Sequence, residues 1–176
     1  MGIFKRFFPK EYAESVFDIN YKELRARGII ALIFDLDNTL APHDVKFPDE
    51  RAKALFAELF ALGFKCCFLS NNRSGERVRV FAEDLGGKIP VIARANKPST
   101  KGLKRALDMM GAKAENAAII GDQIFTDIWC GNRAGVTSIL TKPLSRRDEF
   151  TVKLKRPLEK PVLRAYEKYT KKNGEH

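Results

Sequence analysis

The sequence predicts an α/β protein with a doubly wound parallel sheet between two layers of helices, and two observations carry this prediction. Short runs of continuous apolar residues recur along the middle of the chain, and longer amphipathic segments separate them. Strands that are apolar on both faces and alternate with helices are typical of a parallel sheet that helices cover on both sides. With 176 residues and 44% hydrophobic content, the chain can bury a sizeable core within one domain.

The expected elements follow from these runs and from the residues that end them. The apolar runs predict strands at 29–34, 65–69, 89–93, 117–120 and 136–140. The segments between them predict helices at 48–62, 74–85, 99–110 and 125–134. Pro48 followed by Asp49 is a typical helix start. Gly63, Gly111 and Gly135 stand where a residue in the left-handed conformation would end a helix.

Two carboxylates stand directly after the first of these strands. Asp35 and Asp37 are separated by a single residue. Alternate side chains of a strand share a face, so the two carboxylates start from similar directions. Like charges held close repel one another unless a cation or a shared proton relieves them. The sequence therefore predicts a cation at this strand end.

Polar residues also follow the other predicted strands, at the edge where sheets of this kind bind ligands. Ser70 and Asn71 follow the second strand, Lys97 the third, and Asp122 and Asp127 the fourth. A hard cation with oxygen ligands, by default Mg²⁺, suits the carboxylates. One carboxylate beside a metal can attack a phosphoryl group, and a second can protonate the leaving oxygen. A lysine can neutralise the charge that develops, so the set predicts a phosphoryl-transfer site.

Four short strings then resemble the motifs of the haloacid dehalogenase (HAD) superfamily. "DLDNT", "LSNN", "NKP" and "GDQIFTD" are similar to its four motifs and stand in the same order, each after its own strand. The resemblance covers residues 29–140 and implies a HAD-like, Rossmannoid fold. It implies that Asp35 is the nucleophile and a magnesium ligand. It also implies that Asp37 is the general acid/base and binds the metal through its backbone carbonyl.

The other site residues take their roles from the same resemblance. Ser70, Asn71 and Lys97 would bind the transferring phosphoryl group, and Lys97 would also stabilise it during catalysis. Asp122 would be the third protein ligand of the magnesium ion, with Asp127 behind it. Unrelated acidic loops and an ordinary lysine would leave the repeated placement at strand ends unexplained.

The spacing of the motifs leaves no room for an inserted cap domain. The segment between the first and second motifs is just long enough for a short flap, one helix and one strand. The segment between the second and third motifs is just long enough for one helix and one short strand. We therefore expect one capless domain over 1–176, with a catalytic core of about 29–140 and a basic tail at 142–176. Such a site is open and permits bulky substrates.

Net charge is +10 and is unevenly distributed. Residues 142–176 hold 11 Lys or Arg against 5 Asp or Glu, a net of +6. This balance favours a phosphorylated ligand, an anionic membrane surface or nucleic acid as partner. In the tail, Val162, Tyr166 and Tyr169 recur at helical spacing. Such a helix suits a membrane interface or docking on the domain's own sheet, and both alternatives stay open here.

The three cysteines, two of them adjacent in an apolar strand, are typical of reduced core thiols in a cytosolic protein. The opening residues lack the apolar run of a secretory signal. The predicted location is the cytoplasm, with peripheral association at the inner face of the membrane. The sequence does not indicate an oligomeric state.

In its whole-chain pattern the sequence resembles the YqeG-type family, whose relatives include the mitochondrial phosphatidylglycerophosphate phosphatases. The resemblance implies a Mg²⁺-dependent phosphate monoesterase that acts on a phospholipid, phosphatidylglycerophosphate. A HAD phosphatase for a soluble sugar phosphate or a nucleic acid 3′-phosphate is the alternative. A non-catalytic protein that binds RNA or ribosomes is an alternative of another class, and only bulk charge supports it.

Overall fold

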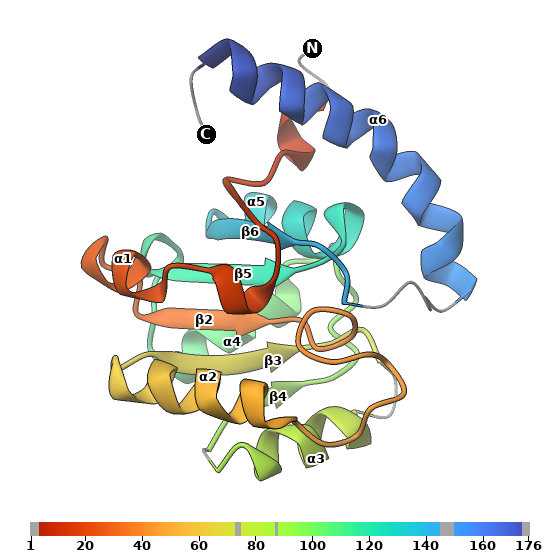
Figure 1. Ribbon diagram of the computed structural model, residues 1–176. Coiled ribbons are helices and arrows are strands. Elements are labelled where there is room, and N and C mark those ends of the chain that lie inside the picture. Colours follow the sequence, from red (N-terminus) through yellow and green to blue (C-terminus); the bar gives the residue numbers. More distant parts are fainter. Residues whose placement is uncertain (1–3, 73–74, 87, 145–149, 174–176) are drawn as a thin grey trace.

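A six-stranded, wholly parallel sheet forms the centre of the molecule (Figure 1). The computed structural model describes residues 4–72, 75–86, 88–144 and 150–173. The strand order is β1-β6-β5-β2-β3-β4. The strands are β1 (Glu11–Ala13), β2 (Ala31–Phe34), β3 (Lys65–Leu69), β4 (Val91–Ile92), β5 (Ala117–Gly121) and β6 (Thr137–Thr141). The order reverses direction beside β2, which places a ligand-binding crevice at its carboxyl end.

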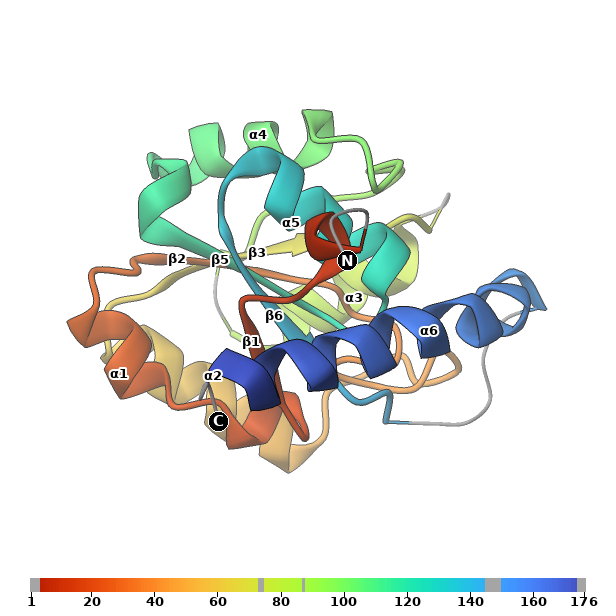
Figure 2. The same ribbon diagram turned by 90° about the horizontal axis from the view of Figure 1, so that it is seen from above.

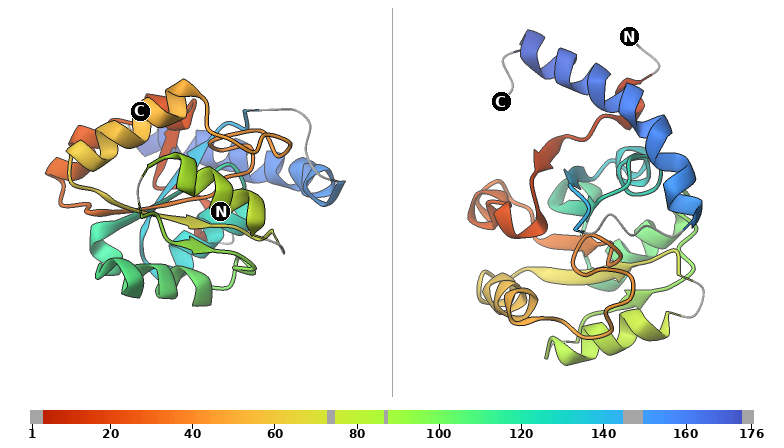
Figure 3. Two further views of the ribbon diagram at one scale, coloured as in Figure 1. Left: turned by 90° about the horizontal axis from the view of Figure 1, so that it is seen from below. Right: turned by 45° about the vertical axis from the view of Figure 1, so that its right-hand side comes forward.

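Helices cover both faces of the sheet, so the predicted three-layer fold is confirmed (Figures 2 and 3). One layer contains α1 (Tyr21–Ala26), α2 (Glu50–Ala61) and α3 (Glu76–Asp84). The other contains α4 (Lys101–Met110) and α5 (Trp129–Ala134). Short helical turns are η1 (Lys5–Phe7), η2 (Val16–Asp18), η3 (Ala114–Asn116) and η4 (Ile124–Ile128), the last a π-helix. The long helix α6 (Phe150–Asn173) ends the described chain.

The continuous apolar strands divide their side chains between two cores. Leu32 and Phe34 of β2 pack with α1, α2 and α3, whereas Ala31 and Ile33 pack with α4 and α5. This division follows from the alternation of side chains along a strand. Because both faces of β2 are buried, packing on both sides of the sheet fixes the position of its carboxyl end.

The five predicted strands and the helices predicted at 48–62, 74–85 and 99–110 exist with their ends shifted by a few residues, and residue 74 lies outside the described residues. Asp49 accepts a hydrogen bond from the Ala52 amide at the start of α2, as its place in the sequence indicates. Gly63, Gly111 and Gly135 all have positive φ after helices. The expected helix at 125–134 is instead the π-helix η4 followed by α5. The sequence did not predict β1 and α1, because a three-residue edge strand and a six-residue helix have little periodicity.

Helix α6 docks on the domain through a third apolar cluster. Val162 is 1% exposed and lies with Phe8, Ile124, Ile128 and Leu140. The rings of Tyr166 and Tyr169 lie 5.5 and 5.6 Å from the ring of Phe8. Of the two alternatives for the aromatic tail, the structure has the docked one. The aromatic side chains of both termini therefore pack on each other and on η4.

No cap domain lies between the described elements. The stretch from β2 to β3 holds a loop and α2, and the described part from β3 to β4 holds α3. Within the described residues, no helix combines the length and the apolar character needed to cross a membrane.

The three cysteines are free and buried, which yields a prediction about thiol chemistry. Burial, with the neighbouring Cys67 adding to it, raises the pKa of Cys66 to about 12, and burial raises the pKa of Cys67 to about 12. Since the thiolate is the reactive form, both thiols should stay unmodified by a disulfide reagent at pH 8. Titration before and after denaturation checks this. We expect all three thiols to react only in the denatured chain, and rapid labelling of Cys66 or Cys67 in the native protein would contradict the packing.

Candidate active site

The site lies at the carboxyl ends of β2, β3 and β5. Register places Phe34 of β2 beside Phe68 of β3 and Ile120 of β5. Asp35 is the next residue, and its amide donates to the Ile120 carbonyl, which continues the ladder by one step. The three strands therefore deliver their first polar residues to one edge of the sheet.

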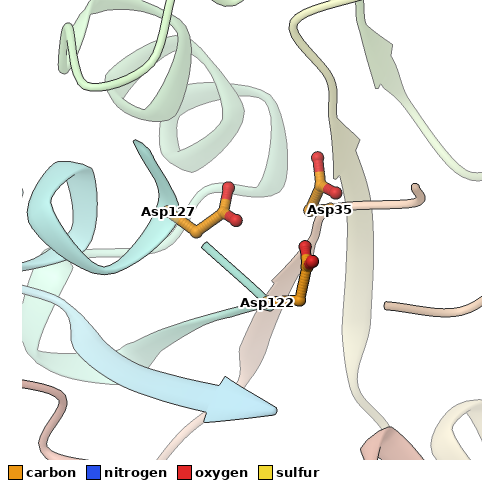
Figure 4. Close-up of side chains that lie close together, drawn as sticks. All are labelled: Asp35, Asp122 and Asp127. Carbon is orange, nitrogen blue, oxygen red and sulfur yellow. The ribbon is translucent and has the colours of Figure 1, made fainter. Parts of the chain in front are cut away.

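Three carboxylates converge at this edge (Figure 4). Ligand oxygens of Asp35, Asp122 and Asp127 all lie within 4.8 Å of one another. The residues are only 5%, 2% and 0% exposed. Water therefore does little to screen their mutual repulsion. The cluster needs positive charge.

Lys97 supplies part of that charge. Its Nζ lies 2.6 Å from Asp35 Oδ1 and 2.6 Å from Asp127 Oδ1, and it donates to the Leu69 carbonyl at 2.7 Å. Burial alone would lower the pKa of this lysine, but Asp127 and Asp35 outweigh burial and raise it. Lys97 is thus a buried ammonium between the carboxylates of Asp35, which follows β2, and Asp127, which lies in η4.

Asn71 holds the backbone of this lysine. The Lys97 amide donates to Asn71 Oδ1 at 2.7 Å, and Asn71 Nδ2 donates to the Lys97 carbonyl at 3.2 Å. The second and third motifs therefore form one unit. The side chain of Asn71 supports the lysine here, and its contact with phosphate stays a prediction.

Ser70 is buried beside the lysine, at the end of β3. It is 1% exposed, and its Oγ accepts from the Asn72 amide at 3.0 Å. This bond shapes the turn after the strand, where successive amides can face a phosphoryl oxygen. Its phosphate-binding role also stays a prediction.

The fourth motif is shaped around Asp127. A Cβ atom on Gly121 would lie 2.4 Å from Asp127 Cγ, so only glycine leaves room for this carboxylate. Asp127 Oδ2 in turn accepts from the Gln123 amide at 3.1 Å. Thr39 Oγ1 lies 3.4 Å from Asp122 Oδ1, a long hydrogen bond that connects the first motif to the fourth.

The carboxylate of Asp37 is not part of this cluster. Arg77 of α3 pairs with it, Nη1 to Oδ1 at 2.5 Å. The same guanidinium donates to the carbonyl oxygens of Pro42 and Val45, both at 2.6 Å. Arg77 therefore fixes both Asp37 and the flap loop that follows it.

The cluster fits a divalent cation with oxygen ligands. Asp35 Oδ2 is buried and has no hydrogen-bond partner among the described residues. The pKa of Asp35 is raised well above its usual value, first by burial and then by Asp127 and Asp122, although Lys97 opposes the shift. A hard cation bound here would relieve both the unpaired oxygen and the repulsion. Asp35 and Asp122 are the residues best placed to hold it, with Asp127 within reach.

The structure thus brings together four predicted residues: Asp35, Asp122, Asp127 and Lys97. Sequence reasoning missed Arg77 and Glu159, which hold Asp37 and the fourth motif. Arg77 lies outside the four motif strings. Glu159 is one of several charged residues in a basic segment. No local pattern distinguishes either residue from a solvated surface charge.

Comparisons with known proteins agree with this geometry. A family model described as HAD-hydrolase-like matches residues 94–149. The chain is 38% identical over 161 residues to the Bacillus subtilis (strain 168) protein named "Probable phosphatase YqeG", covering 92% of each chain. The chain therefore belongs to the YqeG family of the haloacid dehalogenase superfamily. It is a HAD-superfamily phosphatase.

Two more distant relatives add to the comparison. The chain is 30% identical over 158 residues to the Arabidopsis thaliana chloroplastic/mitochondrial phosphatidylglycerophosphate phosphatase 1, covering 84% of this chain and 44% of that protein. The chain thus spans less than half the length of this plant relative. Among solved structures, the cobalt-bound deoxy-D-mannose-octulosonate 8-phosphate phosphatase of Haemophilus influenzae superposes with a TM-score of 0.52 at 18% identity. This match covers 80% of this chain and 90% of that one, and it shows the fold alone.

The carboxylate cluster predicts that a divalent cation stabilises the folded protein. A ligand present at about 100 times its Kd adds about 2.7 kcal/mol to the free energy of unfolding. We expect Mg²⁺ to raise the Tm of the native protein and Asp122→Asn to remove most of that rise. Without metal, the variant should be at least as stable, because one of three repelling charges is gone. Thermal denaturation with and without Mg²⁺ measures both effects.

The matched control is Asp108→Asn, which neutralises an exposed carboxylate on α4. It should keep the full Mg²⁺-dependent rise in Tm. Equal rises in Asp122→Asn and the native protein would place the cation elsewhere.

Proposed function

We propose that this protein is a Mg²⁺-dependent phosphate monoesterase that acts through an aspartyl-phosphate on Asp35. The observation that carries the proposal is the state of that carboxylate. Lys97 holds Oδ1, whereas Oδ2 is buried beside Asp122 and has no hydrogen-bond partner in the part of the chain that the structure describes. Lys97 thus orients one oxygen of Asp35. The Asp35 carboxylate lies at the carboxyl end of β2, at the edge of the sheet where we expect a phosphoryl group to bind.

In the first step, an oxygen of Asp35 attacks phosphorus, and the bond from phosphorus to the substrate oxygen breaks. Asp37 donates a proton to the departing oxygen, so the leaving group is a neutral alcohol. Arg77 keeps Asp37 in place through its 2.5 Å ion pair. Lys97 and the amides after Ser70 stabilise the negative charge on the phosphoryl oxygens.

In the second step, Asp37 takes a proton from water, and the resulting hydroxide attacks phosphorus. The bond from phosphorus to Asp35 breaks, which releases inorganic phosphate, frees the Asp35 carboxylate and leaves Asp37 protonated, as it was before the first step. Bound Mg²⁺ would supply charge neutralisation for the phosphoryl oxygens and for Asp35. Asp35, Asp122 and the backbone carbonyl of Asp37 are the proposed ligands, with Asp127 holding Lys97 behind them.

The proposed substrate is phosphatidylglycerophosphate, which would yield phosphatidylglycerol. Support comes from the Arabidopsis relative, named a phosphatidylglycerophosphate phosphatase, and from a Chlamydomonas reinhardtii protein of the same name. The latter is 29% identical, and the chain spans 59% of its length. The capless site adds support, because an open edge can meet a headgroup that stays within its membrane.

A basic stripe on α6 supports work at an anionic surface. It consists of Lys160, Arg164, Lys168, Lys171 and Lys172, all exposed. Their helical spacing places them opposite the docked face of Val162, Tyr166 and Tyr169. Each lysine or arginine near an anionic membrane surface contributes about 1 kcal/mol to binding. We therefore propose peripheral, electrostatic association with the cytoplasmic face of the membrane.

Two alternatives differ in what the basic stripe would meet. A phosphatase for a soluble sugar phosphate or a nucleic acid 3′-phosphate uses the same site chemistry without needing a membrane. A non-catalytic RNA- or ribosome-binding protein would use the charge alone. The buried Lys97 with its carboxylate partners favours catalysis over this last alternative, since solvated binding charges need no such burial.

The nucleophile can be tested with Asp35→Asn. We expect turnover to fall by about 10³-fold or more, because the residue acts as a unit with the metal and Lys97. Phosphate release from p-nitrophenyl phosphate or a phosphatidylglycerophosphate vesicle measures the rate, and circular dichroism confirms the fold. Asp108→Asn serves as the control with native activity. A near-native rate in Asp35→Asn would mean that another residue attacks.

The substrate can be tested by comparing phosphatidylglycerophosphate in anionic vesicles with glycerol phosphate and a 3′-phosphorylated oligonucleotide. We expect much faster phosphate release from the lipid, and vesicle binding that weakens with salt. The double charge reversal Arg164→Glu/Lys168→Glu should lower vesicle binding about tenfold or more. Vesicle co-sedimentation measures binding.

The matched control reverses two exposed charges on α4, Lys104→Glu and Arg105→Glu. The same change in net charge should leave vesicle binding nearly intact if α6 is the contact surface. Charge reversal is preferable to truncation, because removing α6 would expose Ile124, Ile128 and Phe8. Equal rates on all three substrates without vesicle binding would favour a soluble phosphatase.

A further inference from the structure

Glu159 is a buried carboxylate on α6. The exposed side of this helix is rich in lysine and arginine. Glu159 is 5% exposed, and its Oε1 accepts a hydrogen bond from the Ile124 amide at 2.8 Å. Removing a carboxylate from water is costly unless hydrogen bonds compensate. The next residue, Lys160, is exposed to solvent, whereas the side chain of Glu159 is buried in the protein.

Ile124 belongs to the fourth motif, two residues after Asp122. Its amide and that of Gln123 are consecutive donors at the start of η4. The Gln123 amide donates to Asp127 Oδ2 at 3.1 Å, and the Ile124 amide donates to Glu159 Oε1 at 2.8 Å. Two carboxylates therefore hold two successive peptide units of the same turn. Both hydrogen bonds thus hold the turn that directly follows Asp122.

The two carboxylates come from different parts of the chain. Asp127 lies within the turn, whereas Glu159 lies 35 residues beyond Ile124 on α6. That helix arches past the β1–β6 end of the sheet (Figures 1 and 3). Its Val162 packs with Ile124 and Ile128 in the same apolar cluster. Docking of α6 thus brings both an apolar contact and a charged hydrogen bond to the turn after Asp122.

We propose that Glu159 is a positioning residue for the metal site, and that docking of α6 through Glu159 completes the geometry of the Asp122 turn. The inference rests on the proposed function in one respect, namely that the carboxylate cluster binds Mg²⁺. Glu159 acts through the Ile124 amide and does not contact the reacting atoms. The metal affinity of the site would then depend on a segment outside all four motifs.

A purely stabilising role makes a different prediction. If Glu159 only fastened α6, its loss would lower the Tm but leave the affinity of the folded protein for Mg²⁺ unchanged. If it positions the turn, Mg²⁺ affinity falls in a protein that is still folded. Partners that orient metal ligands from behind typically change affinity by about 10- to 100-fold when removed.

The experiment compares Glu159→Leu, Glu159→Gln and the control Glu167→Leu in the full chain, with the Kd for Mg²⁺ measured by titration calorimetry. Leucine keeps volume but accepts no hydrogen bond, whereas glutamine keeps an acceptor. We expect Glu159→Leu to raise Kd about tenfold or more, and Glu159→Gln to recover most of the affinity. Glu167 is exposed on the same helix, and its replacement should leave Kd unchanged.

Native affinity in folded Glu159→Leu would overturn the proposal, as would an equal loss in Glu167→Leu. If Glu159→Leu does not fold, amide hydrogen exchange decides. We then expect slow exchange at Ile124 in the native protein, and faster exchange together with weaker Mg²⁺ binding in Glu159→Gln. An unprotected Ile124 amide in the native protein overturns the inference. Absence of Mg²⁺ binding in the native protein would instead refute the metal-dependent function itself.

Discussion

The ion pairs of Lys97 with Asp35 and Asp127 are the interaction on which the rest of the site depends. Three buried carboxylates at one sheet edge would repel one another in a medium of low dielectric constant. Removing one partner of such a buried pair typically costs about 3–5 kcal/mol, because the remaining charge is left uncompensated. Two other residues support these ion pairs. Asn71 forms hydrogen bonds with the backbone of Lys97, and Gly121 leaves the space that the Asp127 side chain fills.

Segments near both ends of the described chain also pack against the part of the site that follows Asp122. The turn after Asp122 leads into the short π-helix η4, whose apolar side chains Ile124 and Ile128 are buried against Phe8 and Val162. Once α6 is docked in this way, its aromatic residues face inward and its lysines and arginines face outward. Membrane association of this protein would accordingly be electrostatic, with the catalytic edge left open for a headgroup.

Much of this could be predicted from the sequence because its signals are local. Continuous apolar runs identify β2, β3, β5 and β6, and the polar strings after β2, β3 and β5 identify the edge of the sheet that carries the site. Arg77 and Glu159 could not be predicted in this way. Their partners, Asp37 and the Ile124 amide, lie 40 and 35 residues away, so only the folded chain brings them together. Strand β1 could not be predicted either, because three residues at the sheet edge have too little periodicity to indicate a strand.

Chemical trapping can show whether Asp35 forms the covalent phosphoryl intermediate. Borodeuteride reduces an aspartyl-phosphate to a deuterium-labelled homoserine residue, which peptide mass spectrometry can locate. During turnover with Mg²⁺ and substrate, we expect this label at position 35, and none in protein without substrate. Label at another carboxylate, or no label while phosphate is being released, would mean that Asp35 is not the nucleophile.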